Sequence, residues 1–230
     1  MISSADILAL VVTLKLALIT TCLLFLIGLP LAWWLTKSQW RFKFLIEALI
    51  AMPLILPPTV LGFYLLLALG ENGPFGALMK LVGAQPLAFT FTGLVIGSII
   101  YSLPFVVQPL SNAFAKISKS NLEAAATLGA SPVNQFFSIV LPQARPGLIT
   151  AAVLGFAHTI GEFGVVLMIG GNIPGETQVL SIAIYEHVDS LQYAQAHTLS
   201  ALLLVFSFMM LIFVYALNRR TENVSVSLVK

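Results

Sequence analysis

Charged side chains are scarce in this chain. Lys, Arg, Asp and Glu together make up 9% of its 230 residues, and 59% of the residues are hydrophobic. A soluble globular domain carries about 25% charged residues, so this composition excludes a mostly soluble chain and indicates an integral membrane protein. The eleven basic residues are scattered along the sequence, which leaves no basic patch of the kind that nucleic-acid binding requires.

Several features that define other classes of protein are missing as well. Cys22 is the one cysteine, so an intramolecular disulfide is excluded. No Gly-rich loop ending in Lys-Ser or Lys-Thr occurs, so we expect no ATP hydrolysis by this chain. We recognise no nucleophile–base pair and no three-ligand metal set. The acidic Asp6 stands where a signal peptide would have its basic segment, so we expect no removable signal peptide. The sequence predicts one membrane domain over residues 1–230, without a metal site or an enzyme active site.

Long apolar runs account for most of the chain. An α-helix needs about 20 residues to cross a bilayer, and five runs reach that length. They lie at about residues 9–36, 45–69, 87–110, 147–170 and 197–217. We therefore predict an all-α integral membrane protein with five transmembrane helices, an odd number that places the termini on opposite faces. The tail, residues 218–230, is expected to be disordered.

The basic residues fall on one side of this predicted topology. Those on that side are Lys37, Arg41, Lys43, Lys116, Lys119, Arg145, Arg219, Arg220 and Lys230. The opposite side holds Lys80 with Asp6, Glu71, Glu176, Glu186 and Asp189. Because short cytoplasmic loops carry the excess of Lys and Arg, we predict a cytoplasmic C-terminus and an N-terminus on the outer face.

A long polar interval joins the third and fourth predicted spans, and it is rich in helix signals. Ser120 with Glu123 three positions later is the pattern of a capping box. Gly129 can supply the left-handed residue that ends a helix. Ser131 can cap a second helix, which should end before Pro142. The interval is expected to form a helical hairpin on the cytoplasmic side, with a small apolar face that needs a partner.

This hairpin, residues 118–142, carries a resemblance to a known family. Glu123-Ala124-Ala125, three residues, Gly129, nine residues, Ile139, one residue and Leu141-Pro142 is similar to the EAA loop of ABC-importer permeases. In that family the loop docks into a cleft on the ATPase subunit. The resemblance implies that the ATPase contacts are Glu123, Ala124, Ala125, Leu128, Gly129, Ala130, Ile139, Leu141 and Pro142. The alternative is an amphipathic hairpin that lies on the membrane surface.

Prolines interrupt the second predicted span. Pro53, Pro57 and Pro58 each lack a backbone donor, and Gly62 follows them. The carbonyl groups that lose a partner must be satisfied by protein or by a wet cavity. We expect a broken helix that faces the bundle interior, either as a packed kink or as part of a gate. The run PLILPPTVLG resembles molybdate-type permeases.

The fourth predicted span contains two ionisable residues. His158 and Glu162 are four positions apart and would share a helical face. Such groups are costly in a bilayer and usually face the interior, so they could form a satisfied polar pair, line a transport path, or relay protons. A transport path for a dianion such as molybdate would be blocked by an unpaired carboxylate, because like charges repel. Glu162 should therefore be paired with His158 or a backbone donor, or be protonated. The string GEFG, followed by GGN, resembles molybdate permeases and, less closely, sulfate permeases.

The resemblance covers the chain from the first span to Arg219. It implies a type I ABC-importer permease fold in a bacterial inner membrane, with the N-terminus periplasmic. It also implies the membrane subunit of an ATP-driven importer of a tetrahedral oxyanion, most closely molybdate, with tungstate and sulfate as alternatives. The implied partners are a second copy of the chain, two cytoplasmic ABC ATPase subunits that bind ATP and Mg, a periplasmic oxyanion-binding protein and membrane lipid. The chain itself is expected to need no cofactor.

The path between the two copies is expected to lie along their two-fold axis. The residues expected to line or gate it are Pro57, Pro58, Thr59, Gly62, His158, Glu162, Phe163 and Gly164. A proton-coupled secondary carrier that uses Glu162 and His158 is the alternative from another class. Five spans without an inverted repeat argue against that alternative.

Overall fold

The computed structural model describes the backbone of residues 3–227 and the side chains of residues 3–216. Within this range the chain is built from helices and connecting turns, without strands. The α-helices are α1 (Ser4–Lys37), α2 (Lys43–Ala51), α3 (Pro58–Leu69), α4 (Pro74–Leu81), α5 (Phe91–Ala115), α6 (Lys119–Thr127), α7 (Pro132–Gln135), α8 (Leu141–Gln143), α9 (Arg145–Gly161), α10 (Gly164–Gly170), α11 (Leu180–Asp189) and α12 (Tyr193–Ser227). A 3₁₀-helix, η1 (Met52–Leu54), and a π-helix, η2 (Phe136–Val140), complete the set.

Three described helices are long and apolar enough to cross a membrane: α1, α5 and the Tyr193–Ala216 part of α12. Two bent pairs raise the number to as many as five, if each pair counts as one span. They are Lys43–Leu54 with Pro58–Leu81, bent by 110°, and Pro132–Gln143 with Arg145–Gly161, bent by 74°. The all-α membrane fold predicted from the sequence is confirmed.

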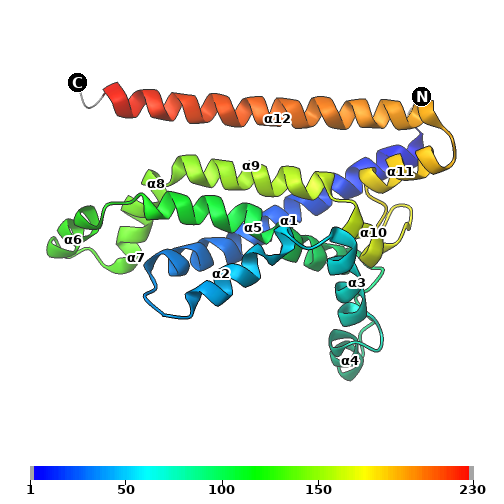
Figure 1. The fold of residues 1–230 in the computed structure, drawn as a ribbon, viewed down its shortest axis with the longest axis horizontal. Helices are drawn as coiled ribbons and strands as arrows, with labels where there is room; N and C mark the ends of the chain where they lie inside the picture. The colour runs from blue at the N-terminus through cyan, green and yellow to red at the C-terminus, as the bar shows by residue number, and fades with distance from the viewer. Residues whose placement is uncertain (1–2, 228–230) are drawn as a thin grey trace.

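The long helices run side by side, and the two termini lie at opposite ends of the molecule (Figure 1). One end, here called the hairpin end, carries α6 and α7. The other end, here called the opposite end, carries α4, α10 and α11. This arrangement separates the 118–142 hairpin from the N-terminus by the full length of the helix bundle.

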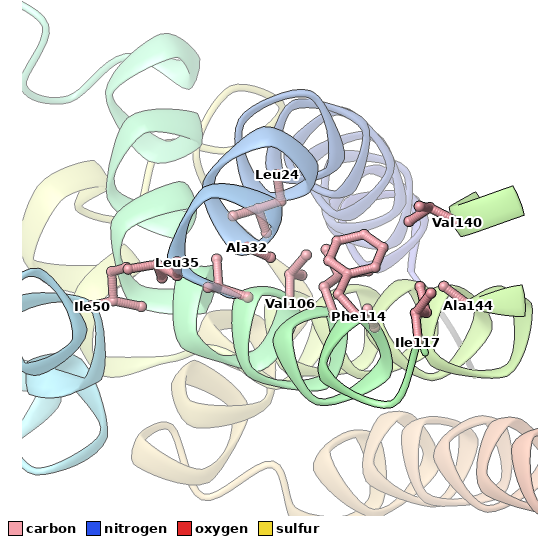
Figure 2. Packing of buried hydrophobic residues seen from close by; sticks show 12 residues of the cluster. Leu24, Ala32, Leu35, Ile50, Val106, Phe114, Ile117, Val140 and Ala144 are labelled. Carbon is pink, nitrogen blue, oxygen red and sulfur yellow. The ribbon is translucent and has the colours of Figure 1, made fainter. Parts of the chain in front are cut away.

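The core lies where α1 packs against α5 and α9. Figure 2 shows its largest cluster, in which Leu24 and Ala32 of α1 meet Val106 and Phe114 of α5. These side chains are 0% exposed. Because lipid tails are as apolar as these side chains, close van der Waals packing rather than transfer out of water holds the helices together. The lipid-exposed surface is apolar too, which is why the helices themselves show little amphipathicity and only buried contacts fix their packing.

The second predicted span is broken, as its prolines led us to expect. Helical structure stops at Leu54 and resumes at Pro58, with Pro57 in an extended conformation as the residue that precedes α3. The connector that follows contains the short helix α4. Pro74 stands at the first position of α4, where its missing N–H needs no partner.

The tail differs from the prediction. We expected disorder from residue 218, but α12 continues as a helix through Ser227. After Gly175 the sequence contains neither glycine nor proline, so no residue type that commonly ends a helix interrupts the last one. Residues 228–230 lie outside the described part of the chain.

A polar cluster fastens the first helix to α11 at the opposite end. Asp6, 3% exposed, accepts a hydrogen bond from His187 Nε2 at 2.8 Å, and His187 Nδ1 lies 2.8 Å from Gln192 Oε1. In addition, Leu180 N–H donates to the Thr13 hydroxyl at 2.7 Å. The hydrogen bond with the Asp6 carboxylate raises the pKa of His187 above its ordinary value.

Candidate functional site

A second helix break lies in the fourth predicted span. The helix α9 ends at Gly161, Glu162 has extended backbone angles (φ −67°, ψ 132°), and α10 begins at Gly164. A Cβ on Gly164 would lie 2.7 Å from Pro58 Cβ at the start of α3. Only glycine allows this approach, so the breaks in the second and fourth predicted spans meet.

A cavity of about 500 Å³ opens beside these breaks, between α3, α5, α9 and α10. Six of the eight predicted path residues line it: Pro58, Thr59, His158, Glu162, Phe163 and Gly164. The rest of the lining is Tyr101, Ala157, Gly161, Leu167 and Met168. None of these lining residues is Lys or Arg. The cavity is therefore mostly apolar, with a few hydroxyl, imidazole and carboxyl groups.

The other two predicted path residues do not line the cavity. Pro57 precedes α3. Gly62 is buried in the crossing of α3 and α10, where an added Cβ would lie 2.8 Å from Met168 Cβ and 3.2 Å from Val165 Cα. Gly62 thus serves helix packing, because the two backbones approach too closely for a side chain.

His158 is held in place by α5 rather than by Glu162. Its Nδ1 lies 2.9 Å from the Ser102 hydroxyl. The ring stacks on Phe105 with 3.8 Å between centroids, and it contacts Tyr101 at 4.8 Å. The prediction that His158 and Glu162 share a helical face is wrong, since α9 ends between them and Glu162 leaves the helical path.

Glu162 is buried, and its carboxyl group has no hydrogen-bond partner among the described residues. The residue is 3% exposed, and neither carboxyl oxygen makes a hydrogen bond of acceptable geometry within the described residues. Ser98 of α5 lies close to this carboxyl, yet its hydroxyl is unpartnered too. The backbone carbonyl of Glu162 accepts a hydrogen bond from the Ser181 hydroxyl. The expected pairing with His158 or a backbone donor is absent, which leaves the protonated form open.

The 118–142 hairpin projects from the hairpin end of the molecule (Figure 1). Its first helix, α6, buries no residue. Leu128 is 88% exposed and Phe137 is 63% exposed, so the apolar face predicted for the hairpin is free in the single chain. On the same hairpin, Ala125 and Phe136 are half-buried, and Phe136 packs on Trp33 with 5.4 Å between ring centroids.

The turn of the hairpin has the predicted geometry. Gly129 has φ +84°, and two backbone hydrogen bonds close the end of α6, from Gly129 N–H to Ala126 and from Ala130 N–H to Ala125. This pair of bonds is a Schellman motif. The Ser131 hydroxyl then accepts from Asn134 N–H at 3.2 Å, which confirms Ser131 as the cap of the second helix.

Two expectations for the hairpin are wrong. Ser118, not Ser120, precedes α6, and the Ser120 hydroxyl contacts Ser118 at 2.6 Å instead of forming a capping box with Glu123. The second helix does not end before Pro142. It continues through η2 and α8, where Leu141 N–H donates to the carbonyl of Phe136. Because proline lacks the N–H and clashes with the carbonyl four residues back, the wider π-turn lets the helix pass Pro142.

The other predicted ATPase contacts lie on both halves of the hairpin. Glu123 and Ala124 are exposed on α6, Ile139 is half-buried in η2, and Leu141 and Pro142 belong to α8. Val140, beside them, is 0% exposed in the core cluster with Phe114. The hairpin is therefore anchored to the bundle by its second half and presents its turn outward.

Comparisons with known proteins agree with this architecture. The model of the family described as "Binding-protein-dependent transport system inner membrane component" matches residues 24–223. The chain is 54% identical to the molybdenum transport system permease protein ModB of Azotobacter vinelandii, over 97% of this chain and 99% of that protein. It is 34% identical to a putative molybdenum transport system permease protein of Bacillus subtilis, over 89% of this chain and 90% of that protein.

More distant similarities follow the same pattern. A sulfate transport system permease protein of Synechococcus elongatus is 34% identical over 90% of this chain and 74% of that protein. Among solved structures, a chain of a bacterial alginate ABC transporter aligns with a TM-score of 0.78 at 17% identity, over 95% of this chain and 80% of that chain. A chain of the MetNI methionine ABC transporter aligns with a TM-score of 0.69 at 19% identity, over 95% of this chain and 98% of that chain.

Proposed function

The chain belongs to the family of binding-protein-dependent transport system inner membrane components, and we propose that it is the permease subunit of an ATP-driven importer of molybdate. The observation that supports molybdate as the substrate is the 54% identity, over nearly the full length of both chains, to a molybdenum transport permease. Tungstate has nearly the same size and charge as molybdate, so it is expected to share the path. Sulfate is the weaker rival, since the sulfate permeases are only 30–34% identical.

The 118–142 hairpin is the proposed docking site for the ATPase. Leu128 and Phe137 are exposed at its turn and on its second half, and exposed apolar groups on a polar hairpin mark a protein-binding surface. In this assignment ATP and Mg bind to two separate cytoplasmic ATPase subunits, each held by one hairpin of a permease homodimer. A periplasmic oxyanion-binding protein delivers the substrate to the opposite end.

The proposed orientation places the hairpin end in the cytoplasm and the N-terminus in the periplasm. Lys37, Arg41 and Lys43 lie on the connection from α1 to α2, and Lys116 and Lys119 lie just before and at the start of α6. Both connections are at the hairpin end in Figure 1. The positive-inside rule supports this orientation, which also brings the hairpin to the compartment that contains ATP.

The proposed path runs past the cavity between the two helix breaks. Thr59, Tyr101 and His158 supply polar groups to its lining, while Leu167 and Met168 are apolar. Without Arg or Lys in this lining, a dianion would meet few charge-compensating groups. The permease should thus let the oxyanion pass rather than capture it, with selectivity residing mainly in the external binding protein.

Uptake by proteoliposomes tests this assignment. The permease would be reconstituted with its ATPase and its binding protein, and labelled molybdate uptake measured with ATP inside, then with tungstate or sulfate as competitor. We expect uptake that requires both ATP and the binding protein, with tungstate competing more strongly than sulfate. Uptake driven by a proton gradient without ATP would instead favour the secondary carrier.

A further inference from the structure

The buried carboxyl group of Glu162 is not explained by the packing around it. Glu162 is 3% exposed, and both of its carboxyl oxygens lack a hydrogen-bond partner within the described residues. Ser98, a polar neighbour on α5, is 0% exposed and its hydroxyl is also unpartnered. An ionised carboxylate in such a place would be uncompensated, which is a costly state inside a bilayer.

Among the described residues, no cation is paired with this carboxyl group. The lining of the cavity contains no Lys or Arg, and the described ion pairs involve Lys43, Lys80 and His187, none of them with Glu162. The titratable groups that face the cavity besides Glu162 are Tyr101 on α5 and His158 on α9. On α3 and α10 the lining residues, Thr59 among them, are not titratable at ordinary pH.

The hydroxyl hydrogens of Thr159 and Ser102 determine which ring nitrogen of His158 carries a hydrogen. The Thr159 hydroxyl donates its one hydrogen to the Gly155 carbonyl at 2.9 Å. In its 3.2 Å contact with Ser102, Thr159 must then accept, so Ser102 is the donor. Ser102 has one hydrogen too, so in its 2.9 Å contact with His158 it accepts from Nδ1–H.

This assignment leaves the Nε2 atom of neutral His158 with a lone pair and no hydrogen. Among the described residues Nε2 has no hydrogen-bond partner, and the ring lines the cavity. Neutral His158 therefore presents an acceptor, which would repel an anion rather than bind it. A donor for an anion at this depth has to come from another group.

We propose that Glu162 is protonated in the resting permease, where both of its carboxyl oxygens are buried, and that its carboxyl O–H becomes a hydrogen-bond donor to the oxyanion when the break between α9 and α10 opens during transport. The proposal rests on the proposed function for the identity of the anion. The proton stays on the carboxyl oxygen, and no covalent bond of the oxyanion changes. The hydroxyl groups of Thr59 and Tyr101 line the same cavity and can add donors as the anion passes.

Two substitutions at this position separate the donor role from mere packing. Glu162→Gln keeps the shape and offers an amide N–H, whereas Glu162→Met keeps the length and offers no donor. In proteoliposomes we expect Glu162→Gln to retain at least about ten times the molybdate uptake of Glu162→Met, the effect of one lost hydrogen bond to a charged acceptor. Glu71→Gln is the matched control, since Glu71 lies outside the cavity and is ion-paired with Lys80 at 3.0 Å.

The pH profile adds a readout that a packing role would not move. Uptake by the unmodified permease should decline in alkaline medium as the carboxyl loses its proton, and uptake by Glu162→Gln should decline less. Tyr101 and His158 are present in both proteins, so their titration cancels in the comparison. Equal uptake by the Gln and Met variants, or equally complete loss in both, would overturn the donor role.

Infrared spectroscopy of the purified permease tests the protonation itself, without any transport. The carbonyl stretch of a neutral carboxylic acid should be present at neutral pH in the unmodified protein and in Glu71→Gln, and absent in Glu162→Gln. If no such band is found, the proposal is wrong even where uptake is normal. If the band is present but the unmodified complex imports no oxyanion, the proposed function is what fails.

Discussion

Gly129 shows how one backbone angle shapes the exposed turn of the 118–142 hairpin. Its φ of +84° is a left-handed value, and an added Cβ would meet no atom within 4 Å. Within the single chain, a side chain here acts through backbone strain, of about 1–2 kcal/mol, and not through a clash. We predict that Gly129→Val lowers ATPase binding and uptake while membrane insertion is preserved. Gly129→Asn, a residue that tolerates this conformation, should retain most of both, and equal activity of the two variants would contradict the prediction.

His187 and Asp6 form a contact whose strength should change with pH. The hydrogen bond with Asp6 raises the pKa of His187, so this contact stabilises the fold fully below the ordinary histidine pKa of about 6.5 and is lost as pH rises through the raised value. We predict that His187→Gln lowers the thermal unfolding midpoint more at about pH 6 than at about pH 9. The exposed His197 supplies the control His197→Gln, and the same loss at both pH values for His187→Gln would refute the pH-dependent contact.

The crossing of α3 and α10 joins the two broken spans, and its closeness depends on Gly62. A methyl group at that position would lie 2.8 Å from Met168 Cβ and 3.2 Å from the backbone of Val165. We predict that Gly62→Ala destabilises the permease by about 1–3 kcal/mol, the usual cost of overpacking. Gly161→Ala adds the same methyl group where no atom lies within 4 Å, and it should be nearly neutral. The thermal unfolding midpoints of the two variants test this prediction. If Gly62→Ala were as stable as Gly161→Ala, the close approach of α3 and α10 would not matter for stability.

Elements defined by neighbouring residues could be predicted from the sequence, and contacts between distant elements could not. The hairpin is local: Gly129 and Ser131 act through bonds that reach a few positions, so its turn and second cap were predictable. The capping box at Ser120 was not, because Ser118 offered an equally good start two positions earlier. Tyr101, Leu167 and Met168 line the cavity only because α5 packs against α9, and α10 packs against α3 and α5. The break at Glu162 also eluded prediction, since His158 and Glu162 fit a continuous helix equally well.

On the scale of the whole molecule, the orientation in the membrane is the step that links the hairpin to ATP. Thr127 lies at the end of α6, and Ser190 follows α11 at the opposite end. In a Cys22→Ala background, a membrane-impermeant thiol reagent added to intact cells should label Ser190→Cys but not Thr127→Cys. Labelling of Thr127→Cys from outside would show that the topology is the reverse of the proposed one. The hairpin would then face away from the cytoplasm and could not bind the ATPase.

The central claim is that an ATPase bound to the 118–142 hairpin drives the oxyanion through this chain. Leu128, 88% exposed at the hairpin turn, can be compared with Leu81, 84% exposed on α4 at the opposite end. Replacement by Asp removes an exposed apolar group in both cases. Only Leu128→Asp should prevent the ATPase from copurifying with the permease, because only Leu128 lies on the proposed docking surface.

The most direct measurement is the ATPase rate of the reconstituted complex, with and without molybdate-loaded binding protein. The rate should rise on addition of the loaded binding protein when the permease is unmodified, and it should not respond when the permease carries Leu128→Asp. An unmodified complex that does not respond, or a Leu128→Asp complex that responds in full, would contradict the account.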